Sequence, residues 1–260
     1  KKLKKILEDP SIKKIGQNIK FDFIVFYKCG ITLSSMEDTM LMSYVLDAGK
    51  NRHNMDTLSE IHLGHKTISF KEMVGTGKKE INFSEVELDK AKDYAAEDAD
   101  VTFRLYKKFV KNLKSEKMIN IYEIFEKPLI KILAFMEIEG VEIDSKFLKS
   151  LSSKFEKKIQ KLEKEVFKIS KKEFNIASPK QLGEIIYNDL KIAGLKKTKK
   201  GSFATSASVL EDLAFKGHEF PKLILDWRQV SKLKNTYSDA LPEHLNPNTK
   251  RVHTSFLLAA

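Results

Sequence analysis

The chain has 260 residues, of which 42% are hydrophobic, enough for one large domain or two smaller domains with ordinary cores. No apolar run approaches the roughly 20 residues that span a bilayer, and no signal peptide is recognisable, so we expect no membrane partner. The single cysteine, Cys29, excludes an internal disulfide, and the six histidines are scattered without a zinc pattern. A reducing cytoplasm is the natural compartment.

The balance of charge points to a polyanionic partner. Lys and Arg number 47 against 36 Asp and Glu, for a formal net charge of +11. Nucleic acid is the commonest partner of such a basic chain. A protein whose whole surface is rich in lysine is the alternative.

Residues 1–115 mix short apolar segments with helical patterns and are punctuated by glycines. This mixture predicts an α/β domain, or the helical remainder of one. Within this region, residues 66–83 are predicted to form a loop centred on Gly75-Thr76-Gly77.

Residues 116–260 are predicted to be mainly helical. A long helix is expected over residues 145–172, with Asp144 as its N-cap. Its apolar residues recur at spacings of three and four and form one stripe, which comprises Phe147, Leu148, Leu151, Phe155, Ile159, Leu162 and Val166.

Three shorter helices are expected after the long one. The sequence Ser178-Pro179-Lys180-Gln181 predicts a capping box with proline at the first helical position, and a helix as far as about Leu190. A basic loop follows around residues 195–202. Further helices are predicted from Ser206 to about Phe215 and from Pro221 to about Ala240.

The segment around Tyr94 and Asp98 is the first that suggests chemistry. On a helix, Asp98 lies on the apolar face, where an unpaired carboxylate is costly and needs a cation, a hydrogen-bond donor or a metal. Tyr94, one turn earlier, places a hydroxyl beside it. An ordinary ion pair or helix-end position is the alternative. The face comprises Ala91, Tyr94, Asp98, Val101 and Leu105.

A second segment pairs Asn18 with Asp22, four residues apart. If a helix begins here, both lie on its first turn, and a carboxylate there suits the helix dipole. Simple N-terminal capping is the alternative interpretation.

Taken together, Asn18-x-x-x-Asp22 and Tyr94-x-x-x-Asp98 resemble the second and third exonuclease motifs of the DnaQ-like superfamily. Other stretches, in the right order, resemble the proofreading domain, the thumb and the entry to the palm of the DNA polymerase I family. They are Glu37-Asp38-Thr39-Met40-Leu41, Arg52-His53, His65-Lys66-Thr67-Ile68, Phe174-Asn175, Ser178-Pro179-Lys180-Gln181, Thr205-Ser206, Lys232-Leu233-Lys234, Thr236-Tyr237 and Asn246-Pro247 with Arg251-Val252-His253-Thr254-Ser255-Phe256.

The resemblance implies an α/β, ribonuclease H-like exonuclease domain that lacks its first strands, followed by a mainly α-helical thumb. Residues 1–115 would be the C-terminal part of the proofreading domain, and residues 116–260 the thumb and the start of the palm. The parent would be a monomeric DNA polymerase of replication and repair, using dNTPs, with two-metal 3′→5′ proofreading by Mg²⁺ or Mn²⁺.

The resemblance also assigns roles in the exonuclease half. Asp22 and Asp98 would be metal ligands, and Tyr94 would orient the attacking water. Phe70 would stack on a terminal base, although an ordinary core position is equally compatible with it. The residues expected near the single-stranded 3′ end are Gln17, Asn18, Phe21, Arg52 and Phe70.

In the second half, a basic face is expected beside an apolar face on the last helix. Arg228, Lys232 and Asn235 share the basic face, and Leu223, Trp227, Val230 and Tyr237 line the apolar one. Weak, salt-sensitive binding of primer–template duplex is implied, with a solvated lysine face as the alternative. The expected contacts are Lys180, Lys196, Lys197, Lys199, Ser202, Arg228, Lys232, Asn235, Thr236, Arg251 and Thr254.

Some expected parts are missing from the sequence. The first exonuclease motif, Asp-x-Glu, is absent, the chain does not begin with Met, and the polymerase carboxylates are expected beyond residue 260. Residues 257–260 also depart from the family pattern. We therefore expect DNA binding without a complete active site, and either a residual metal or none is compatible with the two remaining carboxylates. The alternatives are a free-standing ribonuclease D-like exonuclease and a non-catalytic DNA-binding module.

Overall fold

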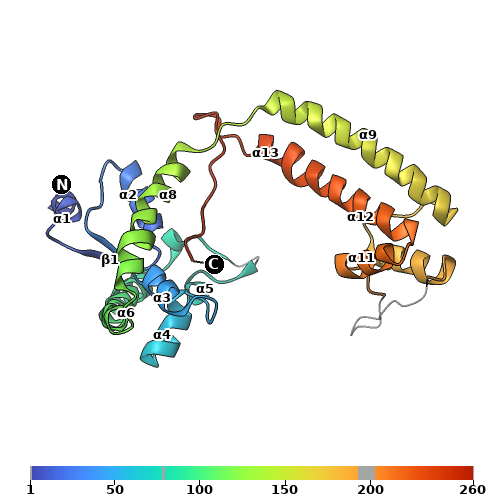
Figure 1. Cartoon of the computed structure of the whole chain (residues 1–260). Helices are drawn as coiled ribbons and strands as arrows, with labels where there is room; N and C mark the ends of the chain where they lie inside the picture. The colour runs from blue at the N-terminus through green and yellow to red at the C-terminus, as the bar shows by residue number, and fades with distance from the viewer. Residues whose placement is uncertain (1, 78–79, 193–202, 260) are drawn as a thin grey trace. The chain divides into compact units, whose positions relative to one another are not determined.

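The computed structural model describes residues 2–77, 80–192 and 203–259, which form two compact units (Figure 1). Unit 1 comprises Lys1–Gly140 with His253–Ala260, and unit 2 comprises Val141–Val252. The chain therefore leaves unit 1 after Gly140 and returns to it at His253. The boundary near residue 115 was predicted between two kinds of domain rather than between two compact units. It stays a prediction.

Unit 1 contains a small parallel sheet covered by helices. Strand β1 (Lys14–Gly16) pairs in parallel with β2 (Met36–Asp38), with Gly16 opposite Asp38, and α2 (Ile19–Lys28) connects them. No other strand is present among the described residues, and the α/β expectation is confirmed. The other helices are α1 (Lys2–Glu8), α3 (Thr39–Asp47), α4 (Met55–Leu63), α5 (Phe70–Val74), η2 (Phe83–Glu85), α6 (Leu88–Ser115), α7 (Ile119–Ile121), η3 (Tyr122–Glu126) and α8 (Lys127–Glu139).

Helix α6 forms the centre of the unit 1 core. Its residues Val101, Leu105, Phe109 and Leu113 recur at spacings of four and are fully buried. This stripe packs on α3 and α4, and it continues from the face that carries Tyr94 and Asp98. The packing therefore fixes the direction in which the polar end of the same face points.

The prediction of a loop over residues 66–83 is wrong in its first half. Residues Phe70–Val74 form α5, because Ser69 and Glu72 make a reciprocal capping box: the Ser69 hydroxyl accepts from the Glu72 N–H, and the Glu72 carboxylate accepts from the Ser69 N–H. Gly75, at a φ of 80°, then ends the helix.

Unit 2 is mainly helical, as predicted. Helix α9 (Ser145–Ser170) is capped by Asp144, which accepts the N–H groups of Lys146 and Phe147. Helix α12 (Glu219–Lys232) packs along α9 and on α11 (Ala207–Phe215) (Figure 1). The remaining elements are α10 (Pro179–Glu184), η4 (Ile185–Asp189), η5 (Leu233–Asp239) and α13 (Ala240–Glu243).

Two local predictions in unit 2 need correction. The Ser178 hydroxyl accepts from the Gln181 N–H, but the Gln181 side chain accepts from the N–H of Asn175, so the capping box is only half formed. Tyr237, predicted on the apolar face, is 49% exposed. It lies in η5, a π-helical stretch whose wider turn rotates the following residues away from the stripe.

A buried carboxylate joins the first turns of α2 and α3. Asp38 is fully buried and accepts from four backbone N–H groups. Its Oδ2 accepts from Ile19 at 2.9 Å, and its Oδ1 from Asn18 at 3.1 Å, Met40 at 2.9 Å and Leu41 at 3.4 Å. Burial raises the pKa of Asp38 to about 6, although the four N–H donors act to lower it.

Replacing Asp38 by alanine is predicted to destabilise unit 1 by about 3 kcal/mol, because a cap is lost and buried N–H groups are left without acceptors. Asp38→Asn keeps one acceptor oxygen and should cost less. Hydrogen exchange at the amides of Asn18 and Ile19 measures the effect directly. Trp227, the single tryptophan, reports on unit 2 and serves as the control, because its fluorescence transition in urea should not move. Unchanged exchange at both amides in Asp38→Ala would contradict this role.

Candidate nucleic-acid interface

Tyr94 and Asp98 form a polar pair on α6. The Tyr94 hydroxyl hydrogen-bonds to the Asp98 carboxylate, and Asp98 Oδ1 is buried without a hydrogen-bond partner among the described residues. Burial raises the pKa of Asp98, and the nearby charges of Glu97 and Asp56 act in the same direction. Burial also raises the pKa of Tyr94 to about 12, assisted by the charge of Asp98. The tyrosine therefore remains a proton donor at neutral pH.

Glu97 fastens the chain before α5 to α6. Its Oε1 lies 2.7 Å from His65 Nε2, and its Oε2 accepts from the Ile68 N–H at 2.6 Å. Two residues after Ile68, α5 begins with Phe70. The sequence did not single out Glu97, because the residues around it give no sign of its contact with His65, which is 32 residues away.

Three aromatic rings meet beside Asp98. The Phe70 centroid lies 5.8 Å from that of Phe83 and 6.3 Å from that of Tyr94, and Phe83 lies 5.9 Å from Tyr94. Phe70 is 50% exposed and Phe83 is 37% exposed, so neither is an ordinary core residue. The rings present an exposed aromatic surface next to the carboxylate, and Phe83 is a member that the sequence analysis missed.

Of the two predicted metal ligands, Asp98 has a feature that suits a metal, and its charged neighbours are Glu97 and Asp56 rather than Asp22. A buried carboxylate oxygen without a partner, as in Asp98, suits a hard cation. Asp22 lies in the first turn of α2, with its pKa also raised by burial although its residue is exposed. However, the described residues contain no group of three or more His, Cys, Asp or Glu placed to hold a metal ion. Two carboxylates are too few for a pair of metals, which needs several.

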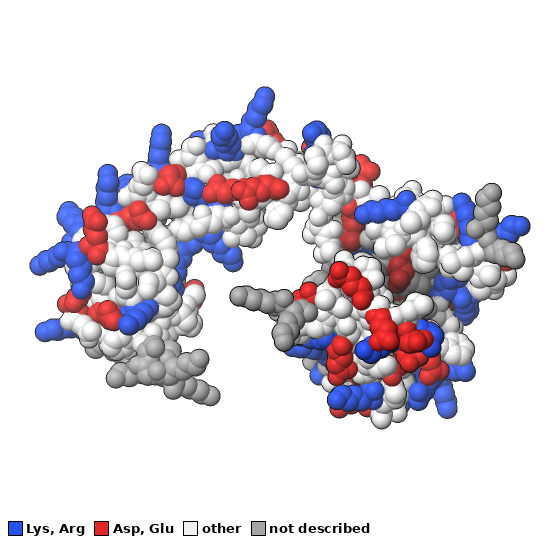
Figure 2. Space-filling view, turned by 180° about the vertical axis from the view of Figure 1, so that it is seen from behind, with Lys and Arg blue, Asp and Glu red and all other residues white. Residues whose placement is uncertain are grey.

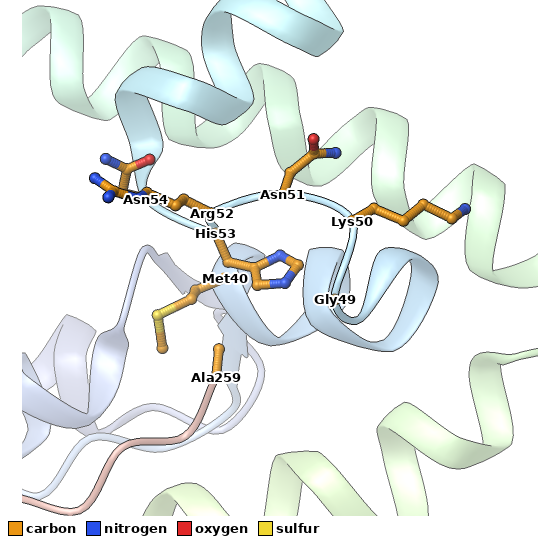
Figure 3. A pocket seen from close by; sticks show the side chains of 8 residues that line it. All are labelled: Met40, Gly49, Lys50, Asn51, Arg52, His53, Asn54 and Ala259. Carbon is orange, nitrogen blue, oxygen red and sulfur yellow. The ribbon is translucent and has the colours of Figure 1, made fainter. Parts of the chain in front are cut away.

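Arg52 lines an open pocket of about 620 Å³. The loop of residues 49–54 forms one side of this pocket, and Met40 and Ala259 lie opposite (Figure 3). The loop is held by Gln17, whose Nε2 donates to the His53 carbonyl at 2.7 Å and whose Oε1 accepts from the Thr39 hydroxyl. Gln17 therefore supports the loop, since both ends of its amide are engaged inside the protein.

Asn18 and Phe21 line a second cavity, of about 360 Å³, which Met40 also lines. Phe21 is 66% exposed. Asn18 adopts the left-handed conformation at a φ of 57°, which asparagine tolerates better than most residues, and its side chain makes no cap. Both side chains are thus available at the surface.

Some of the predicted duplex contacts are engaged by other residues of the protein, and others are exposed to solvent. Arg228 Nη1 donates to the Thr205 carbonyl at 2.7 Å, and burial lowers the pKa of its guanidinium, so Arg228 helps to hold α12 in place. Arg251 lies 3.8 Å from Glu142. The predicted residues that are exposed are Lys180, Lys232, Asn235, Thr236 and, in unit 1, Thr254.

On the visible face, Lys and Arg side chains are mixed with Asp and Glu side chains (Figure 2). The predicted contacts Lys196, Lys197, Lys199 and Ser202 lie outside the described residues. Among the described helices, none is long and apolar enough to span a bilayer.

Comparison with known families accounts for both halves. The model of a 3′-5′ exonuclease matches residues 1–114, and the model of DNA polymerase family A matches residues 145–260. The chain belongs to DNA polymerase family A. The inferred resemblance is confirmed, and a ribonuclease D-like exonuclease is not favoured, because the polymerase model matches the second half.

Relatives in this family match the whole chain. DNA polymerase I of Rhizobium leguminosarum is 48% identical over 259 residues, which are 100% of this chain and 26% of the relative. DNA polymerase I of Pseudomonas aeruginosa is 41% identical over 98% of this chain and 28% of its own length. The chain thus spans about a quarter of these curated relatives.

A solved structure of the family has a similar fold. The POL domain of Pol1 from M. smegmatis, in complex with DNA primer-template and dNTP, superimposes with a TM-score of 0.76 at 25% identity. The match covers 98% of this chain and 41% of that chain.

The Asp98 carboxylate is predicted to lower stability at neutral pH. Its pKa is raised in the folded state, so the folded chain binds more protons than the unfolded chain above pH 3.8, and the free energy of unfolding falls as pH rises through that window. Asp98→Asn removes this loss. In EDTA at pH 7 the variant should be about 1 kcal/mol more stable.

Urea unfolding of both proteins across pH 3 to 7 measures the difference, with pH values chosen to bracket about 4, the ordinary pKa of Asp. The gap between the variant and the parent should close at the acidic end. A variant that is less stable at pH 7 would show that the carboxylate has a stabilising partner.

Proposed function

We propose that this chain is part of a DNA polymerase that copies a template in replication and repair and proofreads by 3′→5′ exonuclease action. By itself the chain binds DNA and completes neither active site. The observation that carries this proposal is the Asp98 carboxylate, whose buried oxygen lacks a partner while the described residues supply no set of three metal ligands. The matches to both family models support the wider assignment.

Residues 1–115 are assigned to the proofreading domain and residues 116–260 to the polymerase domain. The two family matches, 1–114 and 145–260, agree with this order. We assign Mg²⁺ or Mn²⁺, dNTPs and a monomeric, cytoplasmic state to the whole polymerase.

In the exonuclease half, Asp22 and Asp98 are the ligands left for a metal. Divalent ions in such a site activate a water and stabilise the leaving oxygen of a phosphodiester. Tyr94, held by its hydrogen bond to Asp98, points its hydroxyl at this carboxylate, and its high pKa keeps the proton in place. The rings of Phe70 and Phe83 offer a surface on which a terminal base stacks.

Single-strand binding also needs groups for the phosphates. Arg52, exposed at its pocket, offers a guanidinium, and Asn18 offers an amide without an internal cap. Gln17 contributes by holding the loop that carries Arg52. These residues bind and orient a 3′ end, and none depends on a particular base.

In unit 2, duplex binding depends on the exposed end of α12 and the start of η5. Lys232, Asn235 and Thr236 are exposed there, whereas Arg228 is occupied by the Thr205 carbonyl. Lysine and small polar side chains are typical phosphate contacts, which position a protein on DNA without reading sequence. Such binding weakens steeply as salt rises.

Removal of the Lys232 charge is predicted to weaken the binding of a primer–template duplex. In Lys232→Ala, Kd at about 50 mM salt should rise several-fold, and the slope of log K against log salt should become shallower by about 1. Fluorescence anisotropy with a labelled duplex at about 50 and about 200 mM salt measures both quantities.

The matched control is Lys161→Ala, which removes an equally charged, exposed lysine from α9 of the same unit. It should change Kd by less than about twofold, as expected for a charge that makes no phosphate contact. Equal effects of the two variants would mean that binding reflects net charge alone.

Exonuclease activity is predicted to be absent from this chain. A purified preparation with Mg²⁺ or Mn²⁺ should release no mononucleotides from a 3′-labelled single strand, because the described residues supply too few metal ligands. Duplex binding should likewise be the same with Mg²⁺ and with EDTA. Metal-dependent release that disappears in Asp98→Ala would show that the chain holds a working site.

A further inference from the structure

A buried ion pair in unit 1 holds the main chain of a distant segment. Lys20 of α2 and Glu137 of α8 contact each other, with side chains only 5% and 10% exposed. Glu137 Oε1 accepts from the Phe256 N–H at 2.7 Å, and Lys20 Nζ donates to the Phe256 carbonyl. The pair thus engages both polar groups of a single residue's backbone.

Two further contacts fix the same segment, residues 253–259, which we call the strap. His253 Nδ1 lies 2.8 Å from the Glu137 carbonyl, before the clamped residue. After it, Leu258 is buried in the core of unit 1. The strap is therefore held at Phe256 through its backbone, and on either side of Phe256 through the side chains of His253 and Leu258.

The strap forms one wall of the cavity that contains Asn18 and Phe21. Residues Ser255–Ala259 line this cavity together with Asn18, Phe21, Val25 and Lys28. Lys20 and Glu137 lie at it too, but their largely buried side chains are engaged with each other and with Phe256. At about 360 Å³ it falls within the range of about 300–1,000 Å³ typical of small-molecule sites. Ala259 also lines the pocket of Arg52, so the strap borders both candidate single-strand pockets.

We propose that Lys20 and Glu137 are positioning residues for single-strand binding, acting through the strap. Their ion pair holds the backbone of Phe256 and so keeps residues 255–259 at the distance from Phe21 that leaves room for one end of a DNA strand. This inference rests on the proposed single-strand function of Asn18, Phe21 and Arg52.

The chemistry of the pair fits this role better than a purely structural one. Burial of two charges is costly, and apolar residues of similar shape often stabilise a fold as well or better. Apolar residues, however, satisfy neither the C=O nor the N–H of Phe256, whereas the donor of Lys20 and the acceptor of Glu137 satisfy both at once. The charges therefore fix the register of the strap, which an apolar contact would leave free to slide.

The test replaces the pair by apolar residues of similar size, Lys20→Met with Glu137→Leu in one chain. The matched control is Lys127→Met with Glu37→Leu, which removes another largely buried ion pair of unit 1 that makes no contact with the strap. The control also removes the contacts of Glu37 with Tyr122 and Lys13, so its loss of stability should be at least as large as that of the test variant. A loss of binding confined to the test variant therefore does not come from lower stability alone.

Two readouts are measured on each protein. Hydrogen exchange of residues 253–258 reports whether the strap is held, and anisotropy reports the binding of a labelled oligothymidine and of a blunt duplex. In the Lys20→Met, Glu137→Leu variant, the hydrogen-exchange rate of the strap should rise. Its affinity for oligothymidine should fall by about tenfold, which is the order of one lost base contact. Duplex binding should be unchanged. The control variant should resemble the unmutated chain in strap exchange, in oligothymidine binding and in duplex binding.

The outcomes distinguish a failure of the proposed single-strand function from a failure of the positioning role. If the parent chain binds no oligothymidine, the proposed single-strand function fails, whatever the strap does. If the unmutated chain binds oligothymidine, and the Lys20→Met, Glu137→Leu variant releases the strap without any loss of this binding, the positioning role is wrong. Tighter binding after release would overturn it too, because the strap would then obstruct the site.

Discussion

The carboxylate of Asp38 determines where the candidate single-strand site is built. It accepts from the first N–H groups of α2 and of α3, two helices that begin at the ends of neighbouring parallel strands. Asn18 is held in the left-handed conformation at this junction, and Asp22 follows one turn later. Without this shared acceptor, the first turns of α2 and α3 would not be held together, and the pockets beside Met40 would lose their shape.

A second constraint comes from α6, whose buried stripe places Tyr94 and Asp98 on the same face. Leu105 and Phe109 are fully buried in the core, whereas the buried Oδ1 of Asp98 has no hydrogen-bond partner among the described residues. Such an unsatisfied buried group lowers stability and is retained where function needs it. In the proposed function, a divalent cation held together with further acidic residues would be the partner of this oxygen.

Local patterns in the sequence predicted much of the fold. The Asp144 cap and the stripe from Phe147 to Val166 depend on neighbours within a few residues. The cap forms and Ile159, Leu162 and Val166 are buried as expected, whereas Phe147 is 60% exposed. Helix α5 was missed although its capping box was equally local, because Gly75 and Gly77 suggested a loop. Tyr237 was misplaced because a π-helical turn depends on the packing of the bundle rather than on spacing.

The candidate site was only partly predictable for a different reason. Tyr94 and Asp98 share a helix, so their pairing follows from spacing. The contacts of Gln17 with His53, of Glu97 with His65, and of Lys20 with Glu137 join residues 36, 32 and 117 positions apart. No periodicity records such contacts, and they decide which predicted residues face a ligand and which hold others in place.

The most direct test of this account is a hydrogen-exchange map of the whole chain with a primer–template duplex that carries an unpaired 3′ end. Protection is expected in two separate places: α12 and η5 for the duplex, and the start of α2 with the loop of residues 49–54 for the unpaired end. Shortening the unpaired end should remove only the second. Protection that is uniform over the lysine-rich helices, and unaffected by the 3′ end, would contradict the division of DNA binding between the two units.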